Sequence, residues 1–406
     1  MNKADNRVLN VSEDVKWIGI LDREIVTFDI VMETEFGTTY NSYFINAEKP
    51  AIIETVKEKF FETYLKKLES LCNPADLEYI ILNHTEPDHS GSLKHLLELA
   101  PDAIVVGSGN AIRYLNDMIG KPFKSLAVKD GDTLDLGNKT LRFISAPNLH
   151  WPDTIYSYLE EEKLLFTCDS FGAHYCDPEM FDDKVGEYGD SFKYYFDVIL
   201  KPFSRFMLKA IEKIADLEIK AICPGHGPIL RSTWKEKLDL SEKYAREYLE
   251  LTKVDQVKNV LICYVSAYGY TKEMAEIIKI GVEGVGDTNV VLRDIENIDM
   301  GELESEIVKA DGILIGSPTI NQNTLMPVYR LFAVINPLRD KGKHAAAFGS
   351  YGWSGEASDI IAANLKSLKL NVMEELGKFK FSPDEEKRIE LVAFGSNFGS
   401  RLSNCE

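Results

Sequence analysis

The sequence predicts two domains in succession, the first of mixed α/β and α+β character and the second with a doubly wound parallel sheet. Residues 15–55 contain short runs that alternate apolar and polar side chains, as half-buried strands do. Residues 259–372 instead alternate apolar strands with helical patterns of about a dozen residues, which is typical of βαβ units. A charged helical stretch gives way to an apolar strand near residues 252–258, so we expect domains at residues 1–254 and 255–406.

Each element follows from its local pattern. In the first domain, strands are predicted at residues 17–20, 25–28, 43–45, 77–82, 103–106, 141–145, 154–159, 163–168 and 219–223. Helical periodicity predicts helices at residues 56–71, 93–99, 192–214 and 234–253. In the second domain, strands are predicted at residues 259–265, 290–294, 312–317, 344–350 and 369–372.

Composition excludes several classes of protein. The 406 residues carry 46 Lys and Arg against 65 Asp and Glu, a net charge of −19, which argues against binding to nucleic acid or to anionic lipid. Neither an apolar run of membrane-spanning length nor a signal sequence is recognisable, so we expect a cytoplasmic protein. The six cysteines lack C-x-x-C spacing, which excludes a built-in zinc ribbon, rubredoxin site or thioredoxin motif.

Potential metal ligands follow the ends of four predicted strands. Four of the seven histidines lie in these loops, together with three carboxylates and no thiolate. Such a nitrogen- and oxygen-rich set suits iron or manganese. The candidate metal ligands are His84, Glu86, Asp88, His89, His150, Asp169 and His226.

Three loops of the second domain indicate a flavin site. The first leads from a strand into a helix, whose free N–H groups favour a phosphate, and it resembles the phosphate loop of flavodoxins. It matches neither a P-loop nor a dinucleotide motif, so FMN is favoured over FAD or NAD. The candidate FMN contacts are Ser266, Tyr268, Gly269, Tyr270 and Thr271, then Pro318, Thr319, Ile320 and Asn321, then Ser350, Tyr351, Gly352, Trp353, Ser354 and Gly355.

The metal motif resembles a known family pattern. The metallo-β-lactamase fold carries H-x-H-x-D-H, and here Glu86 replaces the second histidine, a substitution characteristic of flavodiiron proteins. The segments at residues 37–43, 150–153 and 170–174 also resemble that family. The resemblance covers nearly the full chain. It implies a metallo-β-lactamase-like αββα sandwich followed by a flavodoxin-like doubly wound sheet.

The resemblance also implies roles for individual residues. His84, Glu86 and His150 would hold one iron, and Asp88, His89 and His226 the other, with Asp169 bridging; whether His89 coordinates stays open. His174 and Tyr195 (or Tyr194) resemble polar residues of the family's substrate pocket. Many relatives have a histidine after the phenylalanine equivalent to Phe28, whereas here Asp29 follows it, so the preferred gas is not fixed by the sequence.

The implied function is that of an oxidoreductase that reduces dioxygen to water, nitric oxide to nitrous oxide, or both. Its cofactors would be FMN and two iron ions, and its electron donor a rubredoxin-like protein, since no NAD(P)H module is recognisable. Two alternatives stay open: a metallo-β-lactamase-fold hydrolase with a regulatory flavodoxin domain, and a non-catalytic flavin electron carrier. Zinc would favour the hydrolase.

Domain size predicts the assembly. Domains of this length have radii near 20 Å, so flavin and iron in separate domains of one chain could lie roughly 40 Å apart, too far for efficient electron transfer. A head-to-tail homodimer, or a dimer of dimers, would bring each flavin to the partner's iron, as the resembling family does.

Overall fold

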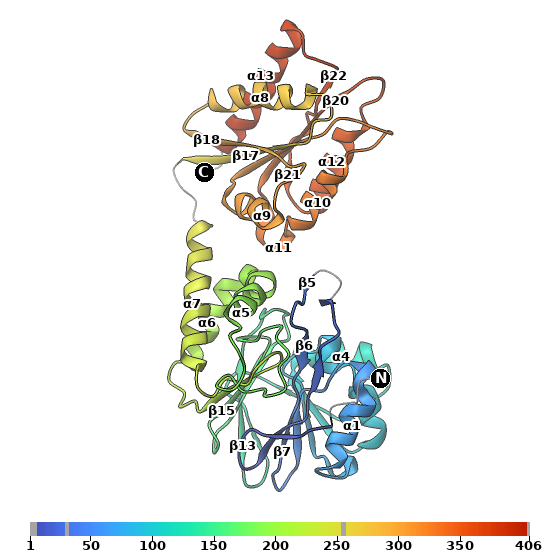
Figure 1. Cartoon of the computed structure of the whole chain (residues 1–406), viewed down its shortest axis with the longest axis vertical. Coiled ribbons are helices and arrows are strands. Elements are labelled where there is room, and N and C mark those ends of the chain that lie inside the picture. Colours follow the sequence, from blue (N-terminus) through green and yellow to red (C-terminus); the bar gives the residue numbers. More distant parts are fainter. Residues whose placement is uncertain (1–5, 29–31, 253–256, 404–406) are drawn as a thin grey trace. The chain divides into compact units, whose positions relative to one another are not determined.

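The structure is a computed structural model that describes residues 6–28, 32–252 and 257–403 (Figure 1). It divides into two compact units, Met1–Leu249 and Glu250–Glu406. The predicted domain boundary between residues 254 and 255 falls outside the described residues and stays a prediction. Across those described ranges, no helix combines the length and apolar character needed to cross a membrane.

Two β-sheets form the centre of the N-terminal unit. The first sheet has the order β1 (Leu9–Asn10), β2 (Val15–Trp17), β7 (Tyr43–Ile45), β8 (Ala51–Ile53), β9 (Tyr79–Ile81), β10 (Ile104–Ser108) and β11 (Ser125–Val128). The second has the order β12 (Thr133–Asp135), β13 (Thr140–Ser145), β14 (Ile155–Leu159), β15 (Leu164–Cys168) and β16 (Ala221–Pro224). Two small pairs lie outside them, β3 (Ile20–Asp22) with β6 (Thr38–Tyr40) and β4 (Thr27–Phe28) with β5 (Met32–Glu33).

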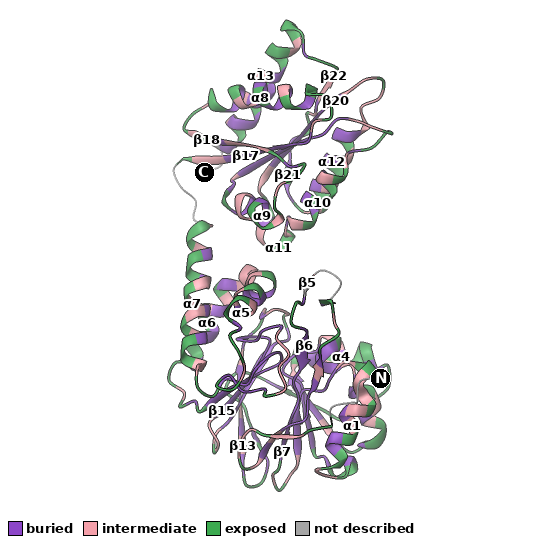
Figure 2. Ribbon diagram, in the orientation of Figure 1, coloured by how far each residue is buried: buried purple, intermediate pink, exposed green. Residues whose placement is uncertain are grey.

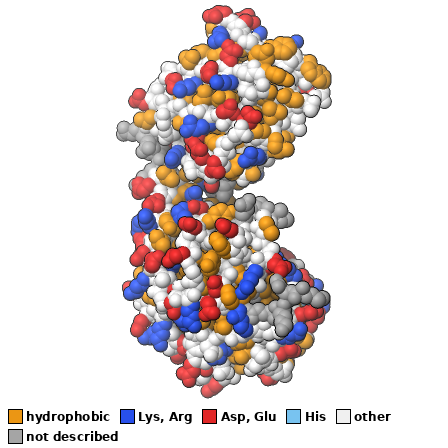
Figure 3. Space-filling view, viewed as in Figure 1, with side chains coloured by type: hydrophobic (Ala, Val, Ile, Leu, Met, Phe, Trp, Pro, Cys, Tyr) orange, Lys and Arg blue, Asp and Glu red, His pale blue; other side chains and the backbone are white. Residues whose placement is uncertain are grey.

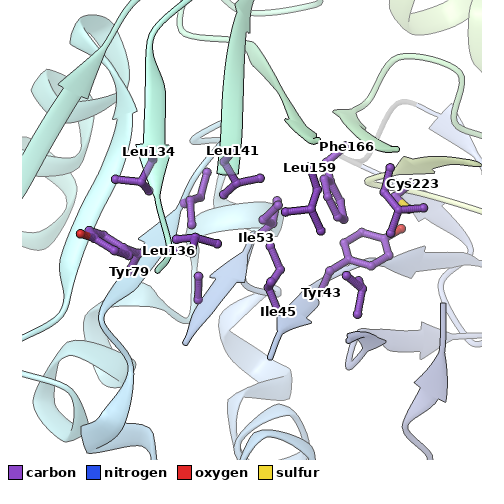
Figure 4. Close-up of a cluster of buried hydrophobic side chains, with 14 of the residues drawn as sticks. Tyr43, Ile45, Ile53, Tyr79, Leu134, Leu136, Leu141, Leu159, Phe166 and Cys223 are labelled. Carbon is purple, nitrogen blue, oxygen red and sulfur yellow. The ribbon is translucent and has the colours of Figure 1, made fainter. Parts of the chain in front are cut away.

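Alternating side chains explain why the two sheets stack. In β7, Tyr43 and Ile45 join a buried cluster that contains residues of both sheets, such as Phe166 of β15 (Figure 4). Phe44 points the other way, into a second cluster formed with helices α1 (Phe61–Glu69), α3 (Leu93–Leu99) and α4 (Gly109–Ile119). Strands buried on both faces need cover on both faces, which helices supply.

The other sheet is covered in the same way. Leu165 of β15 packs against helices α5 (Gly189–Tyr195), α6 (Ser204–Ile214) and α7 (Trp234–Leu251), whereas its neighbour Phe166 faces the first sheet. The four layers confirm the predicted αββα sandwich. In Figure 2 the strands are mostly buried, and the helices expose their outer faces.

Two predicted elements of this unit are interrupted. The helix predicted at residues 192–214 is broken between α5 and α6 by a π-helical turn (Phe196–Leu200) and a 3-10 turn (Lys201–Phe203) that contains Pro202, which has no N–H to continue the helix. The strand predicted at residues 17–20 is broken at Ile18 and Gly19, and a Cβ atom at Gly19 would lie 2.3 Å from the Tyr40 carbonyl oxygen.

The C-terminal unit contains one parallel sheet with the order β18 (Thr288–Asp294), β17 (Lys258–Tyr264), β19 (Gly312–Gly316), β20 (His344–Tyr351) and β21 (Asn371–Val372). Helices α8 (Tyr270–Glu283) and α13 (Glu385–Ser403) contribute to the cluster that contains Ile262. Helices α9 (Met300–Lys309), α10 (Met326–Val334) and α12 (Glu356–Ser367) contribute to the cluster on the other face, with Cys263. The short helix α11 (Pro337–Asp340) also belongs to this unit. The doubly wound sheet predicted from the sequence is confirmed.

One strand of this sheet was not predicted. β22 (Gly377–Lys380) pairs with the last residues of β20, while the predicted β21 pairs only with the first two. The sheet edge beside β20 is therefore formed by two short strands.

Candidate functional site

The seven candidate ligands come from loops at the ends of buried strands. His84 and Glu86 follow β9, and Asp88 and His89 lie on the short helix α2 (Pro87–Ser90). The other three follow strands of the second sheet, His150 after β13, Asp169 after β15 and His226 after β16. The two stacked sheets thus deliver these side chains to one place, where their ligand atoms form two close groups.

The first group contains His84, Glu86, His150 and Asp169. The Glu86 Oε2 atom lies 3.3 Å from His84 Nε2 and 2.9 Å from His150 Nε2. The Asp169 Oδ2 atom lies 3.6 Å from His84 Nε2 and 3.4 Å from His150 Nε2. Two imidazoles and two carboxylates therefore converge on one point.

The second group contains Asp88, His89 and His226, and the other oxygen of Asp169 faces it. The Asp88 Oδ2 atom lies 3.1 Å from His226 Nε2 and 3.4 Å from His89 Nε2. The Asp169 Oδ1 atom lies 3.1 Å from His89 Nε2 and 3.4 Å from His226 Nε2. Asp169 thus offers one oxygen to each group.

Several contacts orient the imidazoles. The Asp153 Oδ2 atom lies 3.2 Å from His84 Nδ1 and also accepts hydrogen bonds from the Thr85 N–H and hydroxyl. The His226 Nδ1–H donates to the Thr39 carbonyl at 2.6 Å, which leaves Nε2 free to bind a metal. These partners fix the rings before any ion binds.

Glu54 lies behind the second group. Its Oε2 atom is 3.8 Å from His89 Nδ1, and its Oε1 atom accepts a hydrogen bond from the Asn83 N–H. Burial raises the pKa of Glu54 to about 7. We did not predict Glu54 or Asp153 as site residues. Asp153 lies in a segment that resembles the family, whereas Glu54 shares with the predicted ligands only its position after a buried strand.

The electrostatics of the two groups favour cations. Burial raises the pKa of Glu86, but hydrogen bonds with His150 and His84 lower it more, so this pKa lies well below its ordinary value. Burial lowers the pKa of His226, but Asp169 and Asp88 raise it to about 10. Both Asp88 oxygens and Asp169 Oδ2 are buried without a hydrogen-bond donor. Imidazole nitrogens and unpartnered buried carboxylates fit a pair of iron ions.

The two predicted pocket residues lie beside the second group. His174 and Tyr195 are buried, and their ring centroids are 4.8 Å apart. His174 Nδ1 lies 2.9 Å from the Thr38 hydroxyl, while His174 Nε2 and the Tyr195 hydroxyl lack partners. Burial lowers the pKa of His174 to about 3, so its ring is neutral. Tyr194 is 39% exposed, which favours Tyr195 as the pocket residue. Asp29 lies outside the described residues.

The predicted flavin residues lie in three loops at the carboxyl ends of neighbouring strands β17, β19 and β20. The Thr271 and Ser350 hydroxyl oxygens are 2.8 Å apart and connect the first loop to the third. The Thr319 N–H donates to the Ser350 carbonyl and connects the second loop to the third. The three loops therefore form one continuous edge, where open parallel sheets bind ligands.

The phosphate loop begins α8. Gly269 has φ +86°, a left-handed conformation that glycine adopts without strain, and the Ser266 hydroxyl accepts a hydrogen bond from the Lys272 N–H. Tyr268 and Trp353 are each 81% exposed, so their ring faces are open to a ligand. Phe381, which follows β22 and lies 6.2 Å from the Tyr270 ring, borders the same edge and was not predicted.

Comparisons with known proteins match both units. A family model described as ODP family beta lactamase matches residues 38–227, and one described as flavodoxin matches residues 262–395. The chain is 39% identical over 402 residues to the flavo-diiron protein FprA2 of Clostridium acetobutylicum, covering 97% of this chain and 99% of that protein. It is 38% identical over 397 residues to the type A flavoprotein fprA of Rhodobacter capsulatus, covering 97% and 91%.

Solved structures agree. The flavodiiron protein of Giardia intestinalis aligns with a TM-score of 0.66 and 31% identity, covering 98% of this chain and 97% of that chain. The rubredoxin oxygen:oxidoreductase of Desulfovibrio gigas aligns with a TM-score of 0.69 and 28% identity, covering 98% and 99%. At the level of the family, the predicted cofactors, FMN and a di-iron centre, are confirmed. The chain belongs to the flavodiiron protein family.

Proposed function

We propose that this protein is an oxidoreductase that reduces dioxygen to water, nitric oxide to nitrous oxide, or both. The observation that supports it most directly is the position of Asp169, whose two carboxylate oxygens face two separate ligand groups. Each group brings two imidazoles and at least one further carboxylate. This is a site for two metal ions that share one ligand.

One iron would be held by His84, Glu86 and His150, and the other by Asp88, His89 and His226, with Asp169 contacting both. We include His89 because its Nε2 atom points to Asp88 and Asp169 and its Nδ1 atom points to Glu54. Two Fe(II) ions and the three ligand carboxylates would leave one net positive charge in place of four, which greatly lowers the desolvation cost of burying the two ions.

When bound, the iron pair and FMN supply the redox chemistry. The chain's own residues supply orientation and hydrogen bonds. Asp153 and the Thr39 carbonyl hold the rings of His84 and His226. The unpartnered Tyr195 hydroxyl can donate a hydrogen bond to a small substrate beside the second group. His174 is neutral, so its Nε2 atom can donate to substrate only while Nδ1 accepts from Thr38.

The test is anaerobic stopped-flow of the fully reduced, iron-loaded protein against dioxygen and nitric oxide in separate experiments. We expect rapid reoxidation by at least one gas, with water or nitrous oxide as product. Slow reoxidation by both gases, or a chain purified with zinc that hydrolyses esters, would overturn the proposal in favour of the hydrolase.

We propose a rubredoxin-like protein as the electron donor. The structural relative from Desulfovibrio gigas is named for its reaction with rubredoxin. Turnover should be slow with NADH alone and fast once rubredoxin and its reductase are added. Fast oxidation of NADH by the isolated protein would contradict this donor.

We also propose a head-to-tail homodimer, alone or paired as a dimer of dimers, in which electrons pass between subunits. Two inactive homodimers are mixed after reversible dissociation, one lacking iron (His84→Ala with Glu86→Ala) and one lacking flavin (Gly269→Glu, after dialysis has removed its weakly bound FMN). Half the reassorted dimers would be mixed, each with one working pair, so about a quarter of wild-type activity should return. Verified heterodimers without activity would exclude transfer between subunits.

We further propose a cytoplasmic location. The five cysteines in the described part of the chain are all free thiols, as expected in a reducing compartment. Cell fractionation tests it, and recovery of the protein outside the cytoplasmic fraction would contradict it.

A further inference from the structure

The turn that carries His226 is held by a buried asparagine that is not a candidate ligand. Asn41 lies between β6 and β7 and is fully buried. Its side-chain Nδ2 donates to the Pro224 carbonyl at 2.9 Å and to the Gly227 carbonyl at 3.0 Å. Its backbone N–H donates to the Gly225 carbonyl at 2.8 Å. One residue therefore bonds the turn on both sides of His226.

The orientation of the Asn41 amide is fixed by Trp17. The indole N–H of Trp17 donates to Asn41 Oδ1 at 2.9 Å, and an indole N–H can only donate. The amide oxygen must therefore face Trp17, which turns the amide nitrogen toward the two carbonyls. Trp17 is fully buried, with the Lys67 ammonium 4.4 Å from its ring, so the donor itself is held in place.

The backbone of the turn packs directly on the candidate ligands and their neighbours, so a small shift of the turn would change the site. A Cβ atom at Gly225 would lie 2.6 Å from His89 Cε1, so the backbone of the turn packs directly on the neighbouring imidazole. Gly227 has φ +77°, and a Cβ atom there would lie 2.6 Å from the Ala173 carbonyl oxygen. A displaced turn would carry His226 Nε2 away from Asp88, now 3.1 Å away.

We propose that Asn41 is a positioning residue that sets the iron affinity of the Asp88, His89 and His226 group and not that of the other group. This inference rests on the proposed function, because it takes His226 as an iron ligand. Asn41 contacts the His226 turn, whereas His84 is oriented by Asp153. Loss of the Asn41 amide should therefore affect the two irons unequally.

The experiment compares Asn41→Ala with wild type by anaerobic Fe(II) titration against a competing chelator, and by Mössbauer spectroscopy of the ⁵⁷Fe-loaded protein. We expect one of the two irons to bind about tenfold more weakly, as is typical when a residue that orients a ligand is lost, and one quadrupole doublet to change. FMN content should stay the same. The matched control is Tyr64→Phe, which removes a buried hydroxyl that contacts Ser42 and not the turn.

A second variant keeps the test decisive if Asn41→Ala does not fold. Trp17→Phe keeps Asn41 but removes the hydrogen bond that orients its amide. The affinity for the same iron should therefore fall by a smaller factor. Unchanged iron binding in the folded variants, or equal weakening of both irons, overturns the role of Asn41. A wild-type protein that does not bind two irons overturns the proposed function instead.

Discussion

The proposed iron site and the proposed flavin site differ in how far the protein holds their residues in place before a cofactor binds. In the proposed iron site, His84 is fully buried and Asp169 is 2% exposed, and the Nε2 atom of each candidate imidazole faces a carboxylate. In the flavin site, Tyr268 and Trp353 are each 81% exposed. A metal ion has no apolar surface on which side chains can pack, so the protein itself must hold the ligands in position. A flavin has a large apolar ring that can pack against exposed side chains of a loop when it binds.

The largest effect should come from Asp169→Ala, because this carboxylate faces both ligand groups. We expect both irons to be lost and turnover to fall more than about 100-fold, beyond the range for residues that only orient a ligand. Iron analysis and gas-consumption rates measure this. Asp135→Ala, which removes an exposed carboxylate that pairs with Lys49 and accepts a hydrogen bond from the Gly137 N–H, is the control. Full iron content in Asp169→Ala would refute the shared ligand.

Next in size should be Gly269→Glu. Binding FMN to the loop as it stands would hold a side chain at position 269 in the left-handed conformation, a strain of about 1 kcal/mol that the free loop of the variant can relax. A carboxylate facing the phosphate costs about 1 kcal/mol more, so FMN should bind roughly 30-fold more weakly. Flavin fluorescence during titration measures it. Gly284→Glu, at the other end of α8 with a negative φ, should bind FMN normally. Loss of iron in Gly269→Glu would show that the two sites are not independent.

Asp153→Asn should weaken iron binding about tenfold, since the variant keeps the shape but loses the charge that orients His84. Chelator competition measures it, and FMN affinity is the internal control. An unchanged iron affinity would show that the charge of Asp153 is not needed to orient His84.

The smallest effect should come from Trp353→Ala. One exposed aromatic ring that stacks on a ligand contributes about 1 kcal/mol, so FMN affinity should fall about fivefold. Isothermal titration calorimetry measures this. Leu338→Ala, at another exposed apolar residue of the same unit, should leave FMN affinity unchanged. Equal loss in both variants would contradict a specific contact at Trp353.

The elements and site residues that the sequence predicted are those that residue type and periodicity indicate directly. The short run of apolar, β-favouring residues at 43–45 predicts a strand, and the structure buries it on both faces. The seven ligand candidates are visible because four of the seven histidines and three carboxylates follow the ends of predicted strands, and the structure brings all seven together. The break at Pro202 was missed because a strong helical pattern continues on both sides of it.

Other features depend on the tertiary structure. Asn41 and Glu54 contact residues far along the chain, such as Gly227 and His89. Asn41 lies in the segment 37–43 that resembles the family, but the sequence does not indicate which residues either side chain contacts. β22 was missed because Gly377–Lys380 contains a single large apolar residue, Phe379. Its strand conformation comes from pairing with β20.

The two short strands beside β20 also bear on self-association. Long, flat edge strands present rows of unpaired N–H and C=O groups that can recruit strands from other molecules. At this edge β21 has two residues and β22 has four, and they are separate, so neither offers a long template. Lys378 and Lys380 add positive charge to the longer of the two. Acidic and basic side chains are also interspersed over the visible surface in Figure 3. The flavodoxin-like sheet is thus protected on this side against intermolecular β-sheet formation during folding.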